Sequence, residues 1–331
     1  MKPKIFVTRR IPQPALDRLS GEFEIELNEA DRVLTKEEIL KGTKNCDVLL
    51  CLLTDTIDEE IIKVNPKLKG IANYAVGYNN IDIEIATNLK IPVSNTPGVL
   101  TQTTADLTWS LILSVSRRIV ESDCYAREGK FTGWGPMLLL GNDIFGKTLG
   151  IIGAGRIGTA VAERAFGFKM KILYTDNKIN KNIETNLGAT KLELNELLGQ
   201  SDFITLHIPL NEYTNHLITK NELKLMKDSA IIINTSRGQI IKEKDLIKAL
   251  QDNEISGAGL DVYEFEPKIS KGLKKLKNVI ILPHIGSATI ETRTAMGMLA
   301  TNNAIAMVKG KKPENIVNPQ IYKKTDSKES A

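Results

Sequence analysis

The stretch LGIIGAGRIGTAVAERA, residues 149–165, contains the spacing Gly153-x-Gly155-x-x-Gly158. An apolar run precedes the glycines, and an alanine-rich segment of helical character follows them. In this context the first glycine allows a tight turn, the second lets a pyrophosphate approach the backbone, and the third lets the helix pack closely on the strand. The helix N-terminus also presents free N–H groups to phosphates. The stretch therefore predicts a strand–turn–helix unit that binds a dinucleotide.

An acidic residue further along the chain supports this interpretation. The next strand-like run, 171–176, ends at Asp176, about 20 residues after the last glycine, where such folds carry a ribose-binding carboxylate. A carboxylate here accepts hydrogen bonds from the adenosine ribose and repels a 2′-phosphate, which favours NAD. Lys178 and Lys181 follow directly, so NADP stays the alternative.

Strand-like and helix-like segments alternate along most of the chain, which predicts largely parallel sheets with crossover helices. The first series has helices that begin at the capping residues Thr35 and Asp58. Its segments are strands at 4–8, 23–27, 47–53 and 70–75 and helices at 35–42 and 58–65. The second series has strands at 147–153, 171–176, 202–209, 230–236, 255–262 and 278–284 and helices at 156–168, 193–199, 219–226 and 243–250.

Two further helices indicate how these series are joined. A long helix is expected from Thr104, with Leu107, Leu111, Val115 and Ile119 four residues apart on one face. A last helix at 287–310 has no strand after it and is expected to return to the first series. We therefore predict an α/β protein of two doubly wound domains. These are a flavodoxin-like domain of residues 1–98 and 286–331 and an inserted Rossmann domain of residues 99–285.

Composition argues against several classes of protein. The 331 residues carry 44 Lys and Arg against 40 Asp and Glu, spread along the chain, which argues against a nucleic-acid partner. No run of about 18 apolar residues suits a membrane span, and the N-terminus lacks the features of a secretion signal. Cys46, Cys51 and Cys124 form no CxxC pair and are expected to be buried free thiols. A cytoplasmic location is the resulting expectation.

Histidine is the usual proton donor when a hydride is transferred to a carbonyl group near neutral pH. The chain has three: His207, His216 and His284. His284, in LPHIGSAT, is the candidate donor because ligands of open α/β sheets bind outside the carboxyl ends of the strands. His207 also ends a strand and is expected to line the cofactor site. His216 lies in a polar stretch and is expected at the surface or at a helix start.

Two more charged residues follow strands of the same domain. Arg237, in NTSRGQ, has a guanidinium fork suited to a carboxylate, and Glu266 could fix the tautomer of a histidine. Each residue taken singly is more often structural than catalytic. Three such groups at successive strand ends of one dinucleotide fold favour a catalytic set of Arg237, Glu266 and His284.

Four segments together are similar to the signature segments of the D-isomer-specific 2-hydroxyacid dehydrogenases. They are GIIGAGRIG, NTSRGQIIKEKDLIKAL, GAGLDVYEFEP and LPHIGSAT. The resemblance extends over nearly the whole chain. Within that family, residues 74–83 and 135–153 most resemble the glyoxylate/hydroxypyruvate reductases.

The resemblance implies a role for individual residues. Arg237 would bind the keto-acid carboxylate and carbonyl, Glu266 would support His284, and His284 would be the general acid. The backbone N–H groups of Val76 and Gly77, in the first domain, would hold the substrate carboxylate. The cofactor would be lined by Thr104, Gly153, Ala154, Gly155, Arg156, Ile157, Gly158, Asp176, Asn177, Lys178, His207, Pro209, Thr214, Thr235, Ser236, Asp261, His284 and Gly286.

The resemblance also implies the reaction and the assembly. The expected reaction is NAD(P)H-dependent reduction of a small 2-keto acid, such as glyoxylate or hydroxypyruvate, to the D-2-hydroxy acid, without a metal. A homodimer is expected, with Trp134 reaching the neighbour's substrate pocket, and Leu53, Trp134 and Met137 limiting substrate size. The alternatives are 3-phosphoglycerate, phosphite or another D-2-hydroxy acid as substrate, and an NAD-sensing corepressor or scaffold.

Overall fold

A computed structural model describes residues 1–322 of the chain. It divides into two compact units: unit 1 is Met1–Leu100 with the residues from Ala288 on, and unit 2 is Thr101–Ser287. The predicted boundaries, at 98 and 285, lie close to these. Residues 323–331 of the predicted segment 286–331 lie outside the described residues. Among the helices of residues 1–322, none is long and apolar enough to cross a bilayer.

Unit 1 is built on a five-stranded parallel sheet of order β2-β1-β3-β4-β5, the flavodoxin-like order. Its strands are β1 (Lys4–Val7), β2 (Glu24–Leu27), β3 (Val48–Leu52), β4 (Gly70–Tyr74) and β5 (Val93–Ser94). Its helices are α1 (Gln13–Glu22), α2 (Lys36–Thr43), α3 (Glu59–Lys63), α4 (Ile83–Asn88) and α13 (Ile290–Val308), with a 3₁₀ turn at Pro319–Tyr322.

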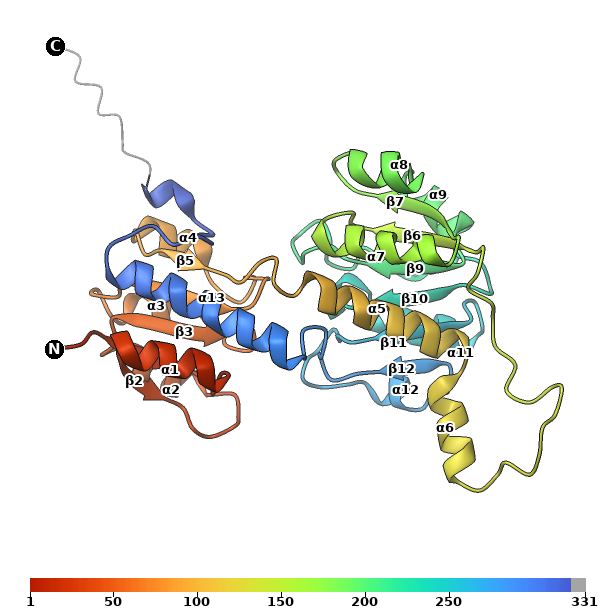
Figure 1. The fold of residues 1–331 in the computed structure, drawn as a ribbon, viewed down its shortest axis with the longest axis horizontal. Coiled ribbons are helices and arrows are strands. Elements are labelled where there is room, and N and C mark those ends of the chain that lie inside the picture. Colours follow the sequence, from red (N-terminus) through yellow and green to blue (C-terminus); the bar gives the residue numbers. More distant parts are fainter. Residues whose placement is uncertain (323–331) are drawn as a thin grey trace, which may run out of the picture. The chain divides into compact units, whose positions relative to one another are not determined.

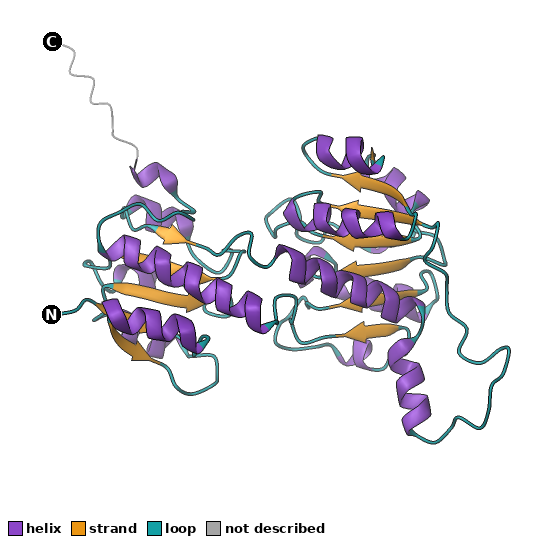
Figure 2. Ribbon diagram, in the orientation of Figure 1, coloured by secondary structure: helices purple, strands orange, loops and turns teal. Residues whose placement is uncertain are grey.

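Helices cover both faces of this sheet, as Figures 1 and 2 show. One hydrophobic cluster joins α1 and α13 to β1, β3 and β4, and a second cluster joins α2, α3 and α4 to the other face. Because β3 and β4 are buried on both sides, their sequences are nearly continuous apolar runs. The helix predicted at 287–310 therefore belongs to unit 1 as α13. The predicted caps are confirmed: Thr35 forms a capping box on α2, and Asp58 accepts a hydrogen bond from Ile61 N.

Unit 2 is built on a seven-stranded parallel sheet of order β12-β11-β10-β9-β6-β7-β8. Its strands are β6 (Thr148–Ile152), β7 (Lys171–Thr175), β8 (Thr190–Lys191), β9 (Phe203–Leu206), β10 (Ile231–Asn234), β11 (Gly257–Leu260) and β12 (Val279–Ile281). Its helices are α5 (Thr101–Ser116), α6 (Ile119–Arg127), α7 (Arg156–Gly167), α8 (Lys181–Leu187), α9 (Leu194–Gln200), α10 (Lys220–Leu223), α11 (Glu243–Gln251) and α12 (Lys271–Lys274), with a 3₁₀ turn at Gly238–Ile240.

The order of these strands places the glycine turn where ligands bind. Strand β6 lies between β7 and β9, so the chain order reverses at β6, and Gly153-x-Gly155-x-x-Gly158 follows it. Helices α5, α7 and α8 pack on one face of the sheet and α9 to α12 on the other (Figure 1). The predicted fold class, two doubly wound α/β domains of flavodoxin-like and Rossmann type, is confirmed.

One predicted helix is wrong in its extent. The helix expected from Thr104 begins at Thr101 and ends at Ser116, and a separate helix, α6, begins at Ile119. The break comes at Arg118, whose backbone is left-handed with φ 52°. Ile119 is consequently 49% exposed and does not share the buried face of α5 with Leu111.

Candidate active site

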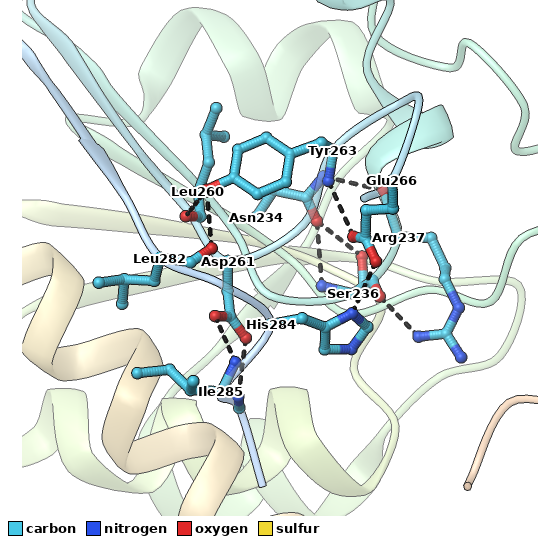
Figure 3. A network of polar contacts seen from close by, with 11 residues as sticks. Asn234, Ser236, Arg237, Leu260, Asp261, Tyr263, Glu266, Leu282, His284 and Ile285 are labelled. Carbon is cyan, nitrogen blue, oxygen red and sulfur yellow. Dashed lines mark hydrogen bonds and ion pairs between the residues drawn. The ribbon is translucent and has the colours of Figure 1, made fainter. Parts of the chain in front are cut away.

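Three loops at the carboxyl edge of the unit 2 sheet carry the predicted catalytic groups (Figure 3). Arg237 follows β10, Glu266 follows β11 and His284 follows β12. His284 Nδ1 lies 2.9 Å from Glu266 Oε2 and donates a hydrogen bond to it. Arg237 Nη1 donates to Ser236 O at 2.7 Å. The structure thus brings histidine and glutamate into direct contact, with the arginine close enough for its charge to act on the same carboxylate.

Electrostatics keep Glu266 ionised. Burial raises the pKa of its carboxyl group, and the hydrogen bond and charge of His284 lower it, so that together with two further groups they hold the pKa below its ordinary value. The backbone N–H of Tyr263, which donates to Glu266 Oε1 at 3.0 Å, and the charge of Arg237 act in the same direction. Both carboxylate oxygens therefore accept hydrogen bonds. Because the ionised carboxylate has no hydrogen to donate, Nδ1 of His284 must carry the hydrogen in their contact.

Backbone contacts hold the three loops together. A Cβ on Gly238 would overlap the carbonyl group of Tyr263, so the loops after β10 and β11 touch where only glycine fits. The Tyr263 hydroxyl donates to Leu282 O at 2.7 Å, which ties the loop after β11 to the chain before His284. These residues were not predicted from the sequence, because nothing in their local pattern indicates these contacts.

Asp261 fixes the backbone that follows the histidine. Its two carboxylate oxygens accept hydrogen bonds from Ile285 N and Gly286 N, both at 2.7 Å. Thr104 Oγ1 donates to Gly286 O at 3.1 Å. Burial raises the pKa of Asp261 despite these N–H donors. The predicted cofactor residues Thr104, Asp261 and Gly286 therefore lie side by side.

The glycine turn has the shape that a dinucleotide needs. Gly153 has φ 95°, and a Cβ on Gly158 would overlap Gly153 O, so neither position accepts a side chain. A Cβ on Gly155 would meet nothing within 4 Å, so space is open in front of the N-terminus of α7. Asp176 accepts hydrogen bonds from Ala154 N at 2.9 Å and from Lys178 N at 3.1 Å. The predicted ribose-binding carboxylate therefore adjoins the turn, and the open space and free helix end fit a dinucleotide.

The remaining predicted cofactor residues line the same edge. Thr214 Oγ1 donates to Pro209 O at 2.7 Å, and Thr235 Oγ1 shares a hydrogen bond of 2.9 Å with Thr108 Oγ1. Ser236 Oγ donates to Asn234 Oδ1 at 3.0 Å. On the surface near the turn, Arg156, Asn177 and Lys178 are exposed and Ile157 is half-buried.

His207 and His216 differ sharply in their surroundings. Within residues 1–322, neither ring nitrogen of His207 has a hydrogen-bond partner, and burial lowers the pKa of this histidine to about 3. His216 is half-buried, and its Nε2 lies 2.8 Å from Glu264 Oε1. Sequence reasoning missed this second histidine–carboxylate pair, which ties the chain at 214–217 to the loop that carries Glu266.

The predicted residues outside the catalytic loops are placed as follows. Val76 and Gly77 form the loop after β4 in unit 1, and Leu53 follows β3, so both positions lie at the carboxyl edge of that sheet. Trp134 and Met137 lie in unit 2 between α6 and β6, where they are 85% and 77% exposed.

A dinucleotide turn at the switch point of a parallel sheet, with an acidic residue after the next strand and a histidine–glutamate pair beside an arginine, defines a nicotinamide-dependent oxidoreductase. The family profile described as "D-isomer specific 2-hydroxyacid dehydrogenase, NAD binding domain" matches residues 109–286. The chain belongs to this family and has its NAD-binding domain.

Full-length relatives agree with that assignment. The chain is 48% identical over 325 residues to the glyoxylate reductase of Korarchaeum cryptofilum (strain OPF8), covering 98% of each chain. It is similar to the crystal structure of a glyoxylate reductase from Paecilomyes thermophila, with a TM-score of 0.85, 34% identity, and coverage of 96% and 99%. It is also similar to an NADPH-dependent glyoxylate/hydroxypyruvate reductase from Sinorhizobium meliloti in complex with NADP and malonate, with a TM-score of 0.85, 29% identity, and coverage of 96% and 97%.

Proposed function

We propose that this enzyme reduces a small 2-keto acid of the glyoxylate or hydroxypyruvate type to the D-2-hydroxy acid. The contact between His284 Nδ1 and Glu266 Oε2, beside Arg237, is the observation that carries the proposal. The names of the relatives support this substrate class, and their similarity extends over nearly the full chain.

His284 supplies the proton in this proposal. Because Glu266 engages Nδ1, the opposite nitrogen, Nε2, is the one that can deliver a proton to the carbonyl oxygen of the substrate. Glu266 fixes the ring orientation and stabilises the protonated imidazolium before transfer. A reduced nicotinamide, when bound, supplies the hydride to the carbonyl carbon.

Arg237 and the loop after β4 bind the substrate in this proposal. The guanidinium of Arg237 holds the carboxylate and carbonyl oxygens and stabilises the negative charge that develops on the carbonyl oxygen. The N–H groups of Val76 and Gly77 are proposed to hold the carboxylate. Trp134, Met137 and Leu53 are proposed to limit the size of the substrate.

The cofactor residues favour NAD over NADP in this proposal. Asp176 is half-buried beside Ala154. Its carboxylate oxygens accept hydrogen bonds from the ribose hydroxyls, and its negative charge repels a 2′-phosphate. Lys178 is exposed two residues later and is the group that would soften this preference.

Two properties of the whole chain remain predictions. A homodimer formed through unit 2 is supported by the exposed apolar residues between α6 and β6, among them Trp134, Met137 and Leu140. A cytoplasmic location is supported by the free thiols of Cys46 and Cys51, which are buried as predicted; the third, Cys124, was predicted to be buried and is exposed.

A substrate panel tests the proposed function. Loss of the NADH absorbance is followed with glyoxylate, hydroxypyruvate, pyruvate and 3-phosphohydroxypyruvate in turn, and each reaction is repeated with NADPH. We expect the highest kcat/KM with glyoxylate or hydroxypyruvate, and a D-configured product where the product is chiral. A clear preference for the phosphorylated acid, or no turnover of any 2-keto acid, would overturn the proposal.

A further inference from the structure

The loop after β4 has its carbonyl groups bonded and its N–H groups open. Three successive carbonyl oxygens, those of Ala75, Val76 and Gly77, each accept a hydrogen bond, the first two from the loop after β5 and the third from a side chain of β4. Within residues 1–322, the backbone N–H groups of Val76 and Gly77 find no acceptor. The bonds are Thr96 N to Ala75 O at 2.8 Å, Asn95 Nδ2 to Val76 O at 2.7 Å and Asn73 Nδ2 to Gly77 O at 2.9 Å.

These bonds determine where the open N–H groups point. In a planar trans peptide the C=O and the following N–H point in opposite directions. A donor that holds Ala75 O therefore turns the N–H of Val76 away from itself, and the donor on Val76 O does the same for Gly77. Val76 and Gly77 are half-buried residues, and two successive backbone N–H groups without an acceptor in the described chain suit an anion.

The two asparagines are themselves held in place. Asn73 is 0% exposed, and its Oδ1 accepts a contact of 3.7 Å from Cys51 Sγ. The backbone of Asn95 is anchored by Asn303 Nδ2, which donates to Asn95 O at 3.2 Å, and by Asn95 N, which donates to Asn315 O at 3.1 Å. The orientation of this loop thus depends on the buried amide groups of Asn73 and Asn303 and on the half-buried amide group of Asn95.

We propose that Asn95 is a positioning residue that aims the N–H group of Gly77 at the substrate carboxylate. The N–H of Val76 beside it is oriented by the backbone bond from Thr96 N to Ala75 O, and Asn73 holds the next peptide of the loop through Gly77 O. This inference rests on the proposed function, because it assumes that the loop binds a 2-keto acid. It gives a part in carboxylate recognition to a side chain of unit 1 that acts through the backbone and not by contact with the substrate.

The test variant is Asn95→Asp, which keeps the shape of the side chain but replaces the donor with an acceptor that Val76 O repels. Asn95→Ala removes the donor without adding a charge and serves if the aspartate does not fold. The matched control is Asn65→Asp in the same unit. Asn65 is buried, whereas Asn95 is half-buried, and Asn65 likewise donates to backbone carbonyls, Thr43 O at 3.0 Å and Cys46 O at 2.6 Å, which lie at the opposite edge of the sheet.

We expect the Asn95 variants to raise KM for glyoxylate about tenfold or more, since a hydrogen bond to a charged group is at stake, with kcat changed less than about threefold. The Kd of NADH should stay unchanged. The preference for glyoxylate over its methyl ester, which lacks the carboxylate charge, should fall by a similar factor. Asn65→Asp should alter neither KM nor this preference.

The outcomes separate the inference from the proposed function. If folded Asn95 variants keep the wild-type KM for glyoxylate and the wild-type preference for glyoxylate over its methyl ester, the inference is wrong and the proposed function still stands. A wild-type protein that reduces no 2-keto acid would overturn the proposed function instead. In that case the Kd of oxamate, an unreactive keto-acid analogue, is measured by calorimetry for wild type and Asn95→Ala. An equal Kd in the two proteins contradicts the inference, and a Kd about tenfold larger in the variant supports it.

Discussion

Glu266 shows how a single residue connects the fold to the chemistry. One of its carboxylate oxygens accepts the N–H of Tyr263, and the other accepts Nδ1 of His284. The sequence predicts this pair because both residues follow neighbouring strands of one parallel sheet, whose carboxyl ends share an edge. It cannot predict the second pair, His216 and Glu264, since His216 follows no strand and its partner lies 48 residues away.

The charge of Glu266 can be removed while its shape is kept. Glu266→Gln no longer stabilises a protonated His284, so we expect kcat to fall at least about tenfold, within the usual range of acid–base catalysis. Steady-state kinetics of both proteins with saturating glyoxylate and NADH measures this fall. Glu264→Gln makes the same change two residues away, and an equal effect there would contradict the role of Glu266.

His207 predicts how stability depends on pH. Burial lowers its pKa from 6.5 to about 3, so between these values the unfolded chain binds a proton that the folded chain does not. This histidine therefore does not lower the free energy of unfolding above pH 6.5. As the pH falls below 6.5, it lowers the free energy of unfolding by up to roughly 1.4 kcal/mol per pH unit. The free energy of unfolding is measured with denaturant for wild type and His207→Gln at about pH 7.5 and about pH 5. It should fall more between these pH values in the wild type than in the variant. Equal slopes would contradict a buried neutral ring.

At the scale of elements, the approach of the loops after β10 and β11 depends on Gly238. In Gly238→Ala the new Cβ meets the backbone of Tyr263, which cannot rotate away, so the loops must separate. We expect a loss of about 2 kcal/mol or more in the free energy of unfolding and a clear fall in kcat, with little change in NADH affinity. Gly167→Ala, at the end of α7 with nothing within 4 Å of its Cβ, is the control. Normal kcat in Gly238→Ala would show that this contact does not position the site.

The sequence predicts the central strands well and the short or interrupted elements poorly. Strands buried on both faces, such as β3 and β10, are continuous apolar runs that stand out from their surroundings. The two-residue strands β5 and β8 are too short to show any period. The division between α5 and α6 was missed because the apolar spacing continues through it. The break depends on Arg118, whose guanidinium contacts Glu121 and Leu140 O in three dimensions.

At the scale of the whole molecule, the exposed segment between α6 and β6 predicts self-association. Met137 and Leu140 are solvent-exposed in the single chain, an arrangement that a partner copy would cover. Sedimentation velocity should give twice the mass of one chain, and Met137→Asp with Leu140→Asp should shift the protein to the monomer. Tyr213→Asp, at a residue that is 81% exposed elsewhere in unit 2, should leave the mass unchanged. A wild-type monomer at micromolar concentration would contradict the dimer.

The central claim is that His284 delivers the proton in the reduction of a 2-keto acid. The most direct test is the rate of NADH oxidation by saturating glyoxylate in wild type and in His284→Ala, with NADH binding measured on both. We predict a kcat lower by roughly 100-fold or more in the variant, the usual contribution of a general acid, with the Kd of NADH retained. A variant that binds NADH and turns over glyoxylate at a near-normal rate would contradict the account.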